Sequence, residues 1–584
     1  MSAVYVWSPV TTKKRISLVR VDDSRRLTGP NLFGVTPGAV CDVLAKPDEQ
    51  LALIDAWSRH LPVLLEAVGW SGERMGHRGH ATGVSLFVTA PRDALYAATD
   101  VNEAAVARAI DELAGNGPSD LPDAVARLKS LIDEETDPSL LALIAEAESR
   151  AVPLLVDEDH LSVGFGRHAQ VYATNELPDV DDVPWQDAGT WGDIPVALVT
   201  GTNGKSTTVR LAASIVSASG KTAGVTSTDY IRVGEHTIDR GDYSGPGGAR
   251  QLLRHADTDL ALLEVARGGM LRRGLGVTNA DAALVTNVAA DHLGEYGIDT
   301  VADLRECKFV VRLGLAPDKP LVLNADDDGV VAFSESLADQ TCLWFGESST
   351  HPVLQSAIAA GNPVYTLEGG ALGRKTFSGF EAIVDVAAIP VTMGGAARHN
   401  VQNALAAAAL TAALGCDDAA IGQGLLEFDG GPDANPGRGN LFTGRGITAI
   451  VDFAHNEHGL RAMADSVARL PAKRRLVLLG QAGDRSDDLI AGLTEAALSC
   501  NPDQLVVCQL PGYERGRAAD EVPKLIEAMA TSHGLAPSAI HHAASPVDGT
   551  RFALDWASDG DVLLILALTQ RGPCTQLIER YLGT

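Results

Sequence analysis

A glycine-rich stretch directly after an apolar run carries the strongest chemical signal in the chain. The run VALVT (196–200) predicts a strand, and GTNGKSTT after it predicts a tight turn that opens a helix. Main-chain N–H groups at such a turn converge on phosphate oxygens, a lysine can reach the β- and γ-phosphates, and a serine hydroxyl can bind Mg²⁺. Val199 occupies the first glycine position of the general GxxxxGK[ST] loop, so this loop is more compact than that pattern. The pattern predicts an ATP site formed by Gly201, Thr202, Asn203, Gly204, Lys205, Ser206 and Thr207.

Two further apolar runs end in residues that suit a metal ion or a phosphate. Glu264 ends the run ALLE, and His292 follows AALVTNVAA with Asp291 before it. Ligands bind at the carboxyl ends of the strands of parallel α/β sheets, so we expect Glu264 to bind Mg²⁺ and His292 to bind a second metal ion or to orient phosphate. The alternatives are structural: Glu264 paired with Arg267, and His292 as an ordinary satisfied side chain.

The C-terminal third places polar residues in glycine-bearing loops after apolar strands. Arginine, with its planar guanidinium, suits a carboxylate or phosphate, whereas a carboxylate such as Asp484 or Asp488 suits a cationic amine. Each residue alone is more typical of an exposed surface charge, but their concentration favours substrate binding. The candidates are His455, Asn456, Asp484, Arg485, Arg515 and Arg517, in VDFAHN, GDRSD and YERGR.

Length and composition exclude several classes of function. A chain of 584 residues predicts three or four domains. The net charge of −28, with no basic block, argues against nucleic-acid and membrane binding. The seven cysteines form no CxxC pair, no apolar run is long enough to span a bilayer, and the N-terminal residues contain no signal-peptide core. We therefore expect a cytoplasmic protein.

The order of the elements predicts a multidomain α/β protein. An N-terminal α+β accessory or substrate domain is expected over 1–175, followed by an acidic linker over 176–193. A central P-loop domain with a parallel sheet is expected over 194–432, and a C-terminal Rossmann-like α/β domain over 433–584. The glycines between 429 and 439 are candidate hinge residues for closure of the last domain.

Several motifs, in order along the chain, resemble those of the Mur ligase family. They are TGTNGKSTT, TSTDYI, GDYSGPGGAR, LLEVARGGMLRRGLG, VTNVAADHLG, RHNVQNALAAAA, GRGNLF, VDFAHNEHGL and GDRSDD. ARGGMLRRGLG and GRGNLF are more characteristic of the cyanophycin synthetase branch, which RRLTGPNLF, APRDALYAATDVNE and VGFGRHAQVYAT in the N-terminal part also resemble. That branch carries an ATP-grasp domain between these parts, and only about 25 residues separate VYAT from the P-loop here. The chain thus resembles the Mur-like half and the N-terminal domain without the ATP-grasp domain.

The resemblance implies roles for individual residues. It implies Mg²⁺ binding by Glu264 and His292, adenine recognition by Asn403, an interdomain arginine at Arg438 and a ribose or phosphate contact at Asp452. The alternatives are that Asn403 caps a helix, Asp452 ends a strand in a turn and Arg438 is a solvated loop charge. Thr228, in TSTDYI, is a substrate-binding candidate. Lys308 lies near the lysine that many Mur ligases carbamylate; the alternative is an ordinary surface or ion-paired lysine.

Together these features predict an ATP- and Mg²⁺-dependent, ADP-forming acid–amino-acid ligase that activates an acceptor carboxylate as an acyl-phosphate. The expected partners are an amino acid, an acidic peptide acceptor and, because the ATP-grasp domain is missing, a separate ATP-grasp enzyme. Two alternatives stay open: a ligase of cell-wall precursors that acts on a nucleotide-sugar peptide, and a non-ligating P-loop NTPase or inactive assembly subunit. A homo-oligomer is compatible with the sequence.

Overall fold

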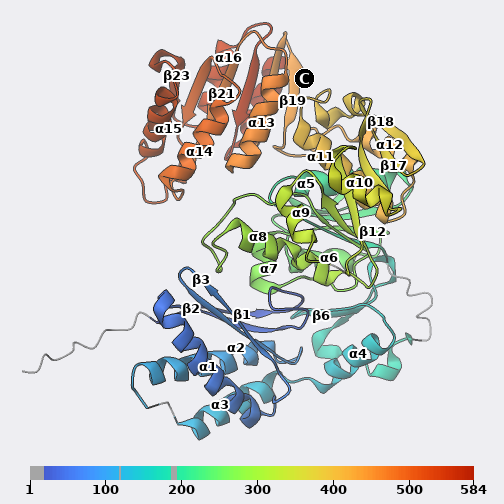
Figure 1. Cartoon of the computed structure of the whole chain (residues 1–584), viewed down its shortest axis with the longest axis vertical. Coiled ribbons are helices and arrows are strands. Elements are labelled where there is room, and N and C mark those ends of the chain that lie inside the picture. Colours follow the sequence, from blue (N-terminus) through green and yellow to red (C-terminus); the bar gives the residue numbers. More distant parts are fainter. Residues whose placement is uncertain (1–18, 118–119, 186–193, 338, 584) are drawn as a thin grey trace, which may run out of the picture. The chain divides into compact units, whose positions relative to one another are not determined.

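The structure, a computed structural model, describes residues 19–117, 120–185, 194–337 and 339–583. Its contacts divide the chain into two compact units, which are described separately below. The first contains the chain up to Thr28, Thr36–Leu141 and the short segment Gly294–Asp299. The second contains Gly29–Val35, Ala142–Leu293 and Thr300–Thr584. Each unit therefore includes a short segment that interrupts the other unit in sequence. Figure 1 labels the elements along the chain.

The first unit is an antiparallel sheet covered by helices. Its strand order is β1-β2-β4-β3. One face of β2 and β4 presents Cys41 and Leu86 to the helices, whose core includes the fully buried Trp57. The indole of Trp57 donates a hydrogen bond to Asn102, so its polar group is satisfied in the core. The elements are β1 (Arg20–Leu27), β2 (Gly38–Leu44), α1 (Pro47–Val68), β3 (Met75–His80), β4 (Gly83–Thr89), α2 (Leu95–Leu113), α3 (Leu121–Glu135) and the first turn of α4 (Pro138–Ser149), most of which belongs to the second unit.

The central part of the second unit is an eleven-stranded sheet in the order β11-β10-β9-β12-β8-β13-β14-β15-β16-β17-β18. The strands from β9 to β16 in this order run parallel, and antiparallel strands extend both edges. The strands β8, β12 and β13 are buried along their whole length, as expected of parallel strands covered on both faces. The alanine-rich helix α11 packs on this sheet and on α5.

The strands of this sheet are β8 (Val196–Thr200), β9 (Ala223–Thr226), β10 (Tyr230–Val233), β11 (His236–Arg240), β12 (Leu260–Glu264), β13 (Ala282–Val285), β14 (Leu321–Asn324), β15 (Cys342–Ser348), β16 (Val364–Glu368), β17 (Ala371–Thr376) and β18 (Gly379–Asp385). Its helices are α5 (Lys205–Ala218), α6 (Pro246–Leu253), α7 (Arg267–Arg273), α8 (Val301–Lys308), α9 (Asp328–Ser334), α10 (Pro352–Ala359), α11 (Arg398–Ala413) and α12 (Asp418–Glu427). A separate three-stranded sheet precedes them, with β5 (Leu154–Val156), β6 (His160–Val163) and β7 (Gln170–Ala173).

The C-terminal part of the second unit is a six-stranded sheet in the order β19-β20-β24-β21-β22-β23, parallel except for β19. Its strands are β19 (Asn440–Gly444), β20 (Ile447–Asp452), β21 (Arg475–Leu479), β22 (Gln504–Cys508), β23 (Ile540–Ala543) and β24 (Val562–Leu566). Its helices are α13 (Glu457–Arg469), α14 (Asp487–Leu498), α15 (Glu521–Ser532), α16 (Pro546–Trp556) and α17 (Arg571–Leu582). The predicted α/β fold class is confirmed.

The domain boundaries and the linker drawn from the sequence stay predictions. Residues 186–193 of the predicted linker lie outside the described residues, and short 3₁₀ turns at Thr174–Glu176 and Val180–Asp182 occur in and beside the rest of it. In the described part of the chain, no helix is both long and apolar enough to cross a membrane.

Candidate active site

The glycine-rich loop joins the central strand β8 to α5, as the sequence predicted. At two positions of the loop no residue other than glycine fits. Gly201 has a φ of +146°, and a Cβ there would collide with Thr286 Oγ1. Gly204 has a φ of +86°, and a Cβ there would collide with Asn403 Oδ1. The loop therefore brings its backbone against the residue that the sequence analysis assigned to the adenine.

The side chains of the loop differ in what they contact. Lys205 Nζ donates to the carbonyl of Thr202 at 3.0 Å, so the ammonium lies over the loop itself. Ser206 Oγ lies 3.3 Å from Thr228 Oγ1, which connects the loop to the end of β9. The buried hydroxyl of Thr207 lies 3.4 Å from Asn435 Nδ2, which donates to it. Since α5 begins at Lys205, its first N–H groups face the same side as Ser206.

Glu264 lies at the carboxyl end of β12, beside β8 in the sheet. Its side chain is 2 % exposed, and Oε2 accepts the N–H of Thr228 at 3.4 Å. The other oxygen, Oε1, is buried and has no hydrogen-bond donor in the part of the chain that the structure describes. A buried carboxylate oxygen without a donor is costly unless a cation satisfies it. Glu264, with the Ser206 hydroxyl joined to it through Thr228, therefore fits a Mg²⁺ ion.

Lys308 is buried at the end of α8, with 4 % of its surface exposed, so it is not a surface lysine. Its Nζ donates to the carbonyl of Gly201 at 2.8 Å, which places the amine directly beneath the phosphate-binding loop. Burial, followed by the charge of Lys205, lowers the pKa of Lys308 to about 7. A large fraction of this amine is therefore neutral near physiological pH.

A cluster of arginines around Asp229 was not predicted from the sequence. Arg210 donates to Asp229 at 2.6 Å, Arg438 donates to it at 2.7 Å, and Arg571 lies 3.8 Å from it. Arg438 also donates to Thr228 Oγ1 at 2.8 Å, so it joins the C-terminal part to the loop after β9. Burial opposes the effect of these arginines, but their charges still hold the pKa of Asp229 below its usual value.

This cluster shows what the sequence did and did not reveal. Arg438 is held by a half-buried ion pair and is not the solvated loop charge considered as an alternative. Asp229 adjoins the predicted Thr228, and Arg571 comes soon after the apolar strand β24, which is the signal that could have indicated it. Three guanidiniums around one carboxylate leave positive charge beside the loop, which suits an anionic group.

Asn403 and Asp452 lie on opposite sides of the boundary between the central and C-terminal parts. Asn403 faces a cavity of about 220 Å³, whose lining also includes Gly204, His399, His458 and Gly459. Asn403 lies within α11 and does not cap it. Asp452 ends β20, and its Oδ1 accepts the N–H of Ala454 at 2.6 Å. Burial raises the pKa of Asp452 to about 6.

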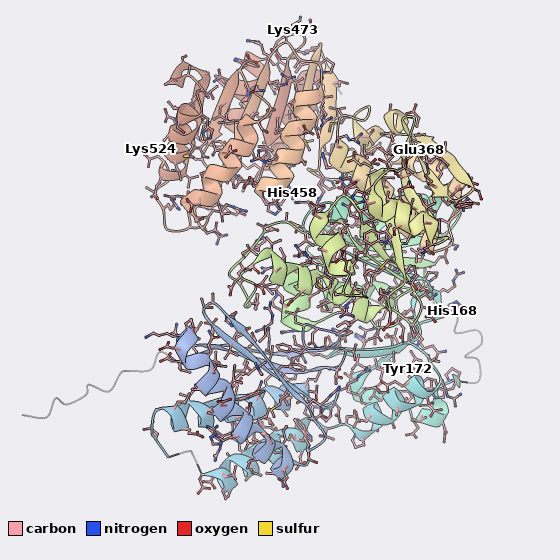
Figure 2. All side chains as sticks on the ribbon, viewed as in Figure 1. His168, Tyr172, Glu368, His458, Lys473 and Lys524 are labelled. Atoms are coloured by element: carbon pink, nitrogen blue, oxygen red, sulfur yellow. The ribbon has the colours of Figure 1, made fainter. Side chains whose placement is uncertain are left out.

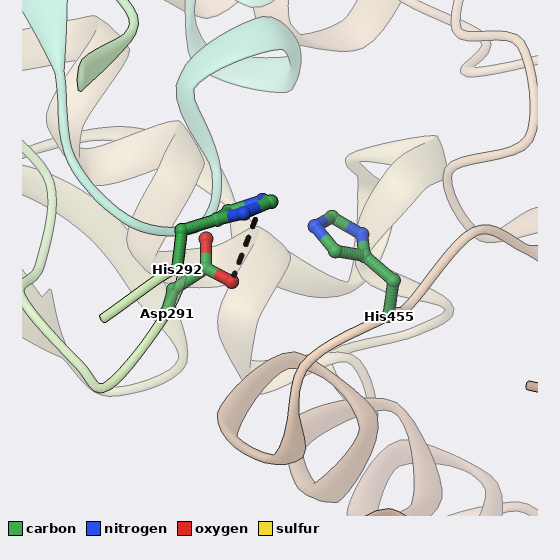
Figure 3. A group of neighbouring side chains, drawn as sticks. All are labelled: Asp291, His292 and His455. Atoms are coloured by element: carbon green, nitrogen blue, oxygen red, sulfur yellow. Dashed lines mark ion pairs between the residues drawn. The ribbon is translucent and has the colours of Figure 1, made fainter. Parts of the chain in front are cut away.

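His292 forms a cluster with Asp291 and with His455, which comes from the loop after β20. The ligand atoms of the three side chains lie within 4.8 Å of one another. Figure 3 shows the two imidazoles facing each other, with the His292–Asp291 ion pair (4.0 Å) beside them. Burial lowers the pKa of His455, although Asp291 opposes the shift, so its ring nitrogen is available as a neutral donor to a metal. The structure thus brings together His455, predicted to bind substrate, and His292, predicted to bind metal.

The remaining C-terminal candidates lie on two neighbouring loops, 483–486 and 513–517. Arg517 donates to the carbonyls of Gly483 and Arg485 at 2.9 and 2.8 Å and pairs with Asp487 at 2.8 Å. Arg517 therefore joins the two loops and is not available as a substrate ligand. After burial, the positive charge of Arg485 also lowers the pKa of His455, so Arg485 lies within electrostatic range of the Asp291–His292–His455 cluster. Asp484 and Arg515 are exposed, and their substrate roles stay predictions.

Family models match the two parts of the second unit that form this site. Residues 199–411 match the Mur ligase middle domain, and residues 437–567 match the Mur ligase glutamate ligase domain. The chain therefore belongs to the Mur ligase family, with the middle and C-terminal domains of that family in the expected order, and the predicted resemblance is confirmed.

Within this family the chain is similar to cyanophycin synthetases. It is 38 % identical to the cyanophycin synthetase of Synechocystis sp. over 64 % of this chain and 42 % of that protein. It is 26 % identical to the UDP-N-acetylmuramoyl-L-alanyl-D-glutamate–2,6-diaminopimelate ligase of Bacillus velezensis, over 63 % of this chain and 71 % of that one. Among solved structures, E. coli FolC in complex with ADP matches with a TM-score of 0.49 and 19 % identity, covering 67 % of this chain and 90 % of that one. The chain spans less than half the length of the cyanophycin synthetases it matches.

Proposed function

We propose that this protein is an ATP-dependent ligase that joins a carboxylate of an acidic acceptor to the amine of an amino acid and releases ADP and phosphate. The observation that carries the proposal is the convergence of Ser206, Glu264 and Arg438 on Thr228, beside the loop that carries Lys205. This arrangement combines a phosphate-binding loop, a carboxylate that fits a metal ion and an arginine from the C-terminal domain. The ligase names of the relatives, together with their family, support the same class of reaction.

The reaction needs two steps, because a carboxylate does not react with an amine at neutral pH. In the first step an acceptor carboxylate oxygen attacks the γ-phosphorus of ATP, the bond to the β-phosphate oxygen breaks, and ADP leaves. In the second step the amine nitrogen attacks the acyl carbon, the C–O bond to phosphate breaks, and the nitrogen loses a proton. Amide, ADP and phosphate are the products.

The residues of the chain act on this sequence through charge and position. Lys205 and the first N–H groups of α5 stabilise the negative charge that develops on the transferred phosphoryl group. Arg438, held by Asp229 and Thr228, adds a positive charge from the C-terminal domain. Its contacts also bring that domain over the loop, which excludes water from the acyl-phosphate.

Glu264 and Ser206 would hold one Mg²⁺ ion, and Asp291, His292 and His455 a second divalent cation. A bound ion there supplies additional positive charge for the phosphate oxygens. For Lys308 we propose carbamylation, because its neutral amine can add CO₂ and its position beneath Gly201 faces the same loop. The resulting carboxylate would offer the metal site another oxygen ligand.

The cyanophycin synthetase relatives favour an acidic peptide acceptor over a nucleotide-sugar peptide. The acceptor would then come from a separate enzyme of the ATP-grasp class, acting in the cytoplasm. Five free cysteines of the second unit, Cys307, Cys416, Cys500, Cys508 and Cys574, are buried thiols compatible with a reducing compartment.

The test is to incubate the purified protein with Mg·ATP, pools of amino acids and short acidic peptides, and to search for condensation products by mass spectrometry. We expect ADP release that requires both an acceptor and an amine, and we expect Lys205→Ala to abolish it. Lys221→Ala, which alters another lysine of the central domain, is the matched control and should remain active. Near-normal activity of Lys205→Ala would refute the proposed ligase function. Condensation onto a uridine-nucleotide acceptor would favour the cell-wall precursor ligase. ATP hydrolysis that needs neither acceptor nor amine would favour a non-ligating NTPase.

A further inference from the structure

The side chain of Asn203 points out of the phosphate-binding loop toward the C-terminal domain. Its Nδ2 donates to Asn456 Oδ1 at 3.2 Å and to His458 Nδ1 at 3.0 Å. Its Oδ1 accepts from Asn456 Nδ2 at 3.1 Å. We call these three residues, Asn203, Asn456 and His458, the asparagine bridge. It joins the loop before α5 to the start of α13, where Figure 2 labels His458.

The orientation of both amides in the bridge is determined by their other contacts. Asn456 Oδ1 also accepts the N–H of Gly459 at 2.9 Å and caps α13, so Nδ2 of Asn456 must face Asn203. Oδ1 of Asn203 must then face Asn456 Nδ2, so Nδ2 of Asn203 faces His458 Nδ1, which accepts in the Nε2–H tautomer. Burial lowers the pKa of His458, which keeps that ring neutral. The two amides therefore form a reciprocal pair of hydrogen bonds, and exchanging the oxygen and nitrogen of either amide would break that pair.

The backbone of Asn203 is held as firmly as its side chain. Its N–H donates to Asn287 Oδ1 at 3.0 Å, and its carbonyl accepts from Thr286 Oγ1 at 2.7 Å and Asn287 Nδ2 at 3.1 Å. The direction of the Asn203 side chain is therefore determined by the conformation of the loop. The backbone groups that hold the loop here are separate from the first N–H groups of α5, which face the phosphate side.

The start of α13 also forms part of the cavity wall. His458 and Gly459 also line the 220 Å³ cavity that Asn403 faces. A Cβ at Gly459 would lie 3.1 Å from Asn203 Oδ1, a tight contact that shows how closely the helix approaches the loop. The bridge thus determines where one wall of this cavity stands relative to the phosphate-binding loop.

From these contacts we infer that Asn203 is a positioning residue, whose bridge to Asn456 and His458 couples the occupancy of the phosphate-binding loop to the position of the C-terminal domain. The inference rests on the proposed function, and it adds a positioning role to Asn203 and Asn456, whose roles in binding ATP and substrate stay predictions. A phosphate that orders the loop strengthens the bridge, and by reciprocity a closed C-terminal domain strengthens phosphate binding. A loop without the bridge still binds phosphate but no longer holds α13.

The experiment measures hydrogen exchange of the full chain with inorganic tripolyphosphate and Mg²⁺. Tripolyphosphate has no base or ribose, so it can occupy the loop without touching α13 directly. We expect it to slow exchange in residues 201–208. We also expect it to slow exchange about tenfold in the first two turns of α13, a factor that corresponds to the free energy of the hydrogen bonds in one amide pair. A parallel sample with Mg·ATP reports whether the loop binds nucleotide at all.

Two variants remove the bridge in different ways. Asn203→Ala removes the amide from the loop, and Asn456→Ser keeps a helix-capping hydroxyl but is too short to reach Asn203. In both variants we expect tripolyphosphate to protect the loop but to change the exchange of α13 by less than twofold. Ser545→Ala is the matched control, because it removes the cap of α16 in the same domain without touching the bridge, and it should behave as the wild type.

The outcomes separate the inference from the proposed function. Protection of α13 that persists in Asn203→Ala and Asn456→Ser would overturn the inference. Two results with the wild type would also overturn it, provided that Mg·ATP protects the loop. In the first, tripolyphosphate protects neither the loop nor α13; in the second, tripolyphosphate protects the loop but not α13. A wild-type loop that Mg·ATP leaves unprotected would instead refute the proposed function.

Discussion

The replacement Gly204→Ala tests how closely the phosphate-binding loop approaches Asn403. Gly204 precedes α5 with a φ of +86°, and an added Cβ would collide with Asn403 Oδ1. Gly220, just beyond the other end of the same helix, has a φ of +80°, and a Cβ there would meet nothing within 4 Å. Gly220→Ala is therefore a matched control, with the same backbone strain and no collision.

The expected magnitudes follow from these two environments. An alanine in the left-handed region costs about 1–2 kcal/mol at either position. At Gly204 the side chain of Asn403 must also move, and its 3.0 Å hydrogen bond to the buried Asn400 is lost, which costs about 1–3 kcal/mol more. We expect Gly204→Ala to lower the free energy of unfolding by about 2–5 kcal/mol in total, and Gly220→Ala by about 1–2 kcal/mol.

The assay combines denaturant unfolding with the dissociation constant of Mg·ATP. Gly204→Ala should weaken ATP binding at least about tenfold, because Asn403 leaves the cavity, while Gly220→Ala should leave it unchanged. In a background of Asn403→Ala the collision no longer exists, so adding Gly204→Ala should cost only the backbone strain. Equal destabilisation by Gly204→Ala and Gly220→Ala, with equal ATP affinity, would refute the reasoning.

Three further replacements test charges in the site. Since burial raises the pKa of Asp452 from 3.8 to about 6, the folded chain keeps this proton at pH 5 and the unfolded chain loses it, so the group stabilises the fold at pH 5 and this stabilisation is lost as the pH rises through 6. Between pH 5 and pH 8 this contribution to the free energy of unfolding changes by about 1.4 kcal/mol. Asp452→Asn should abolish that change when urea unfolding is measured at both pH values, and a pH dependence equal to that of the wild type would contradict the raised pKa. The pKa of Lys308, lowered to about 7 by burial and then by Lys205, predicts amide formation that rises from pH 6 to pH 8 in the presence of bicarbonate, and no activity for Lys308→Arg, whose charge is permanent; a flat profile would argue against carbamylation. Arg438→Lys keeps the charge but cannot repeat the two N–H groups that bind Asp229 and Thr228 together, so kcat should fall about 10- to 100-fold with a smaller change in ATP affinity, and a normal kcat would exclude the proposed role.

The sequence by itself determined the features that depend on neighbouring residues. An apolar strand followed by two glycines, a lysine and a serine specifies a phosphate-binding turn, because the required φ values and the start of the helix are local properties. The fully apolar runs likewise specify buried parallel strands, and the fold class and the family followed from them and from the order of the motifs. Glu264 could be placed at the end of a strand for the same reason.

Only the tertiary structure decided which of these groups meet. Arg210, Arg438 and Arg571 come from three distant segments, and the sequence contains no signal that they surround Asp229. The burial of Lys308 depends on how the end of α8 packs beneath Gly201, which no spacing reveals. The side chain of Asn203, a residue of the predicted ATP site, contacts Asn456 and His458 at the start of α13, which the loop motif does not reveal. The physical reason is the same in each case: local spacing determines the backbone, whereas the partner of a polar side chain depends on strand order and domain packing across hundreds of residues.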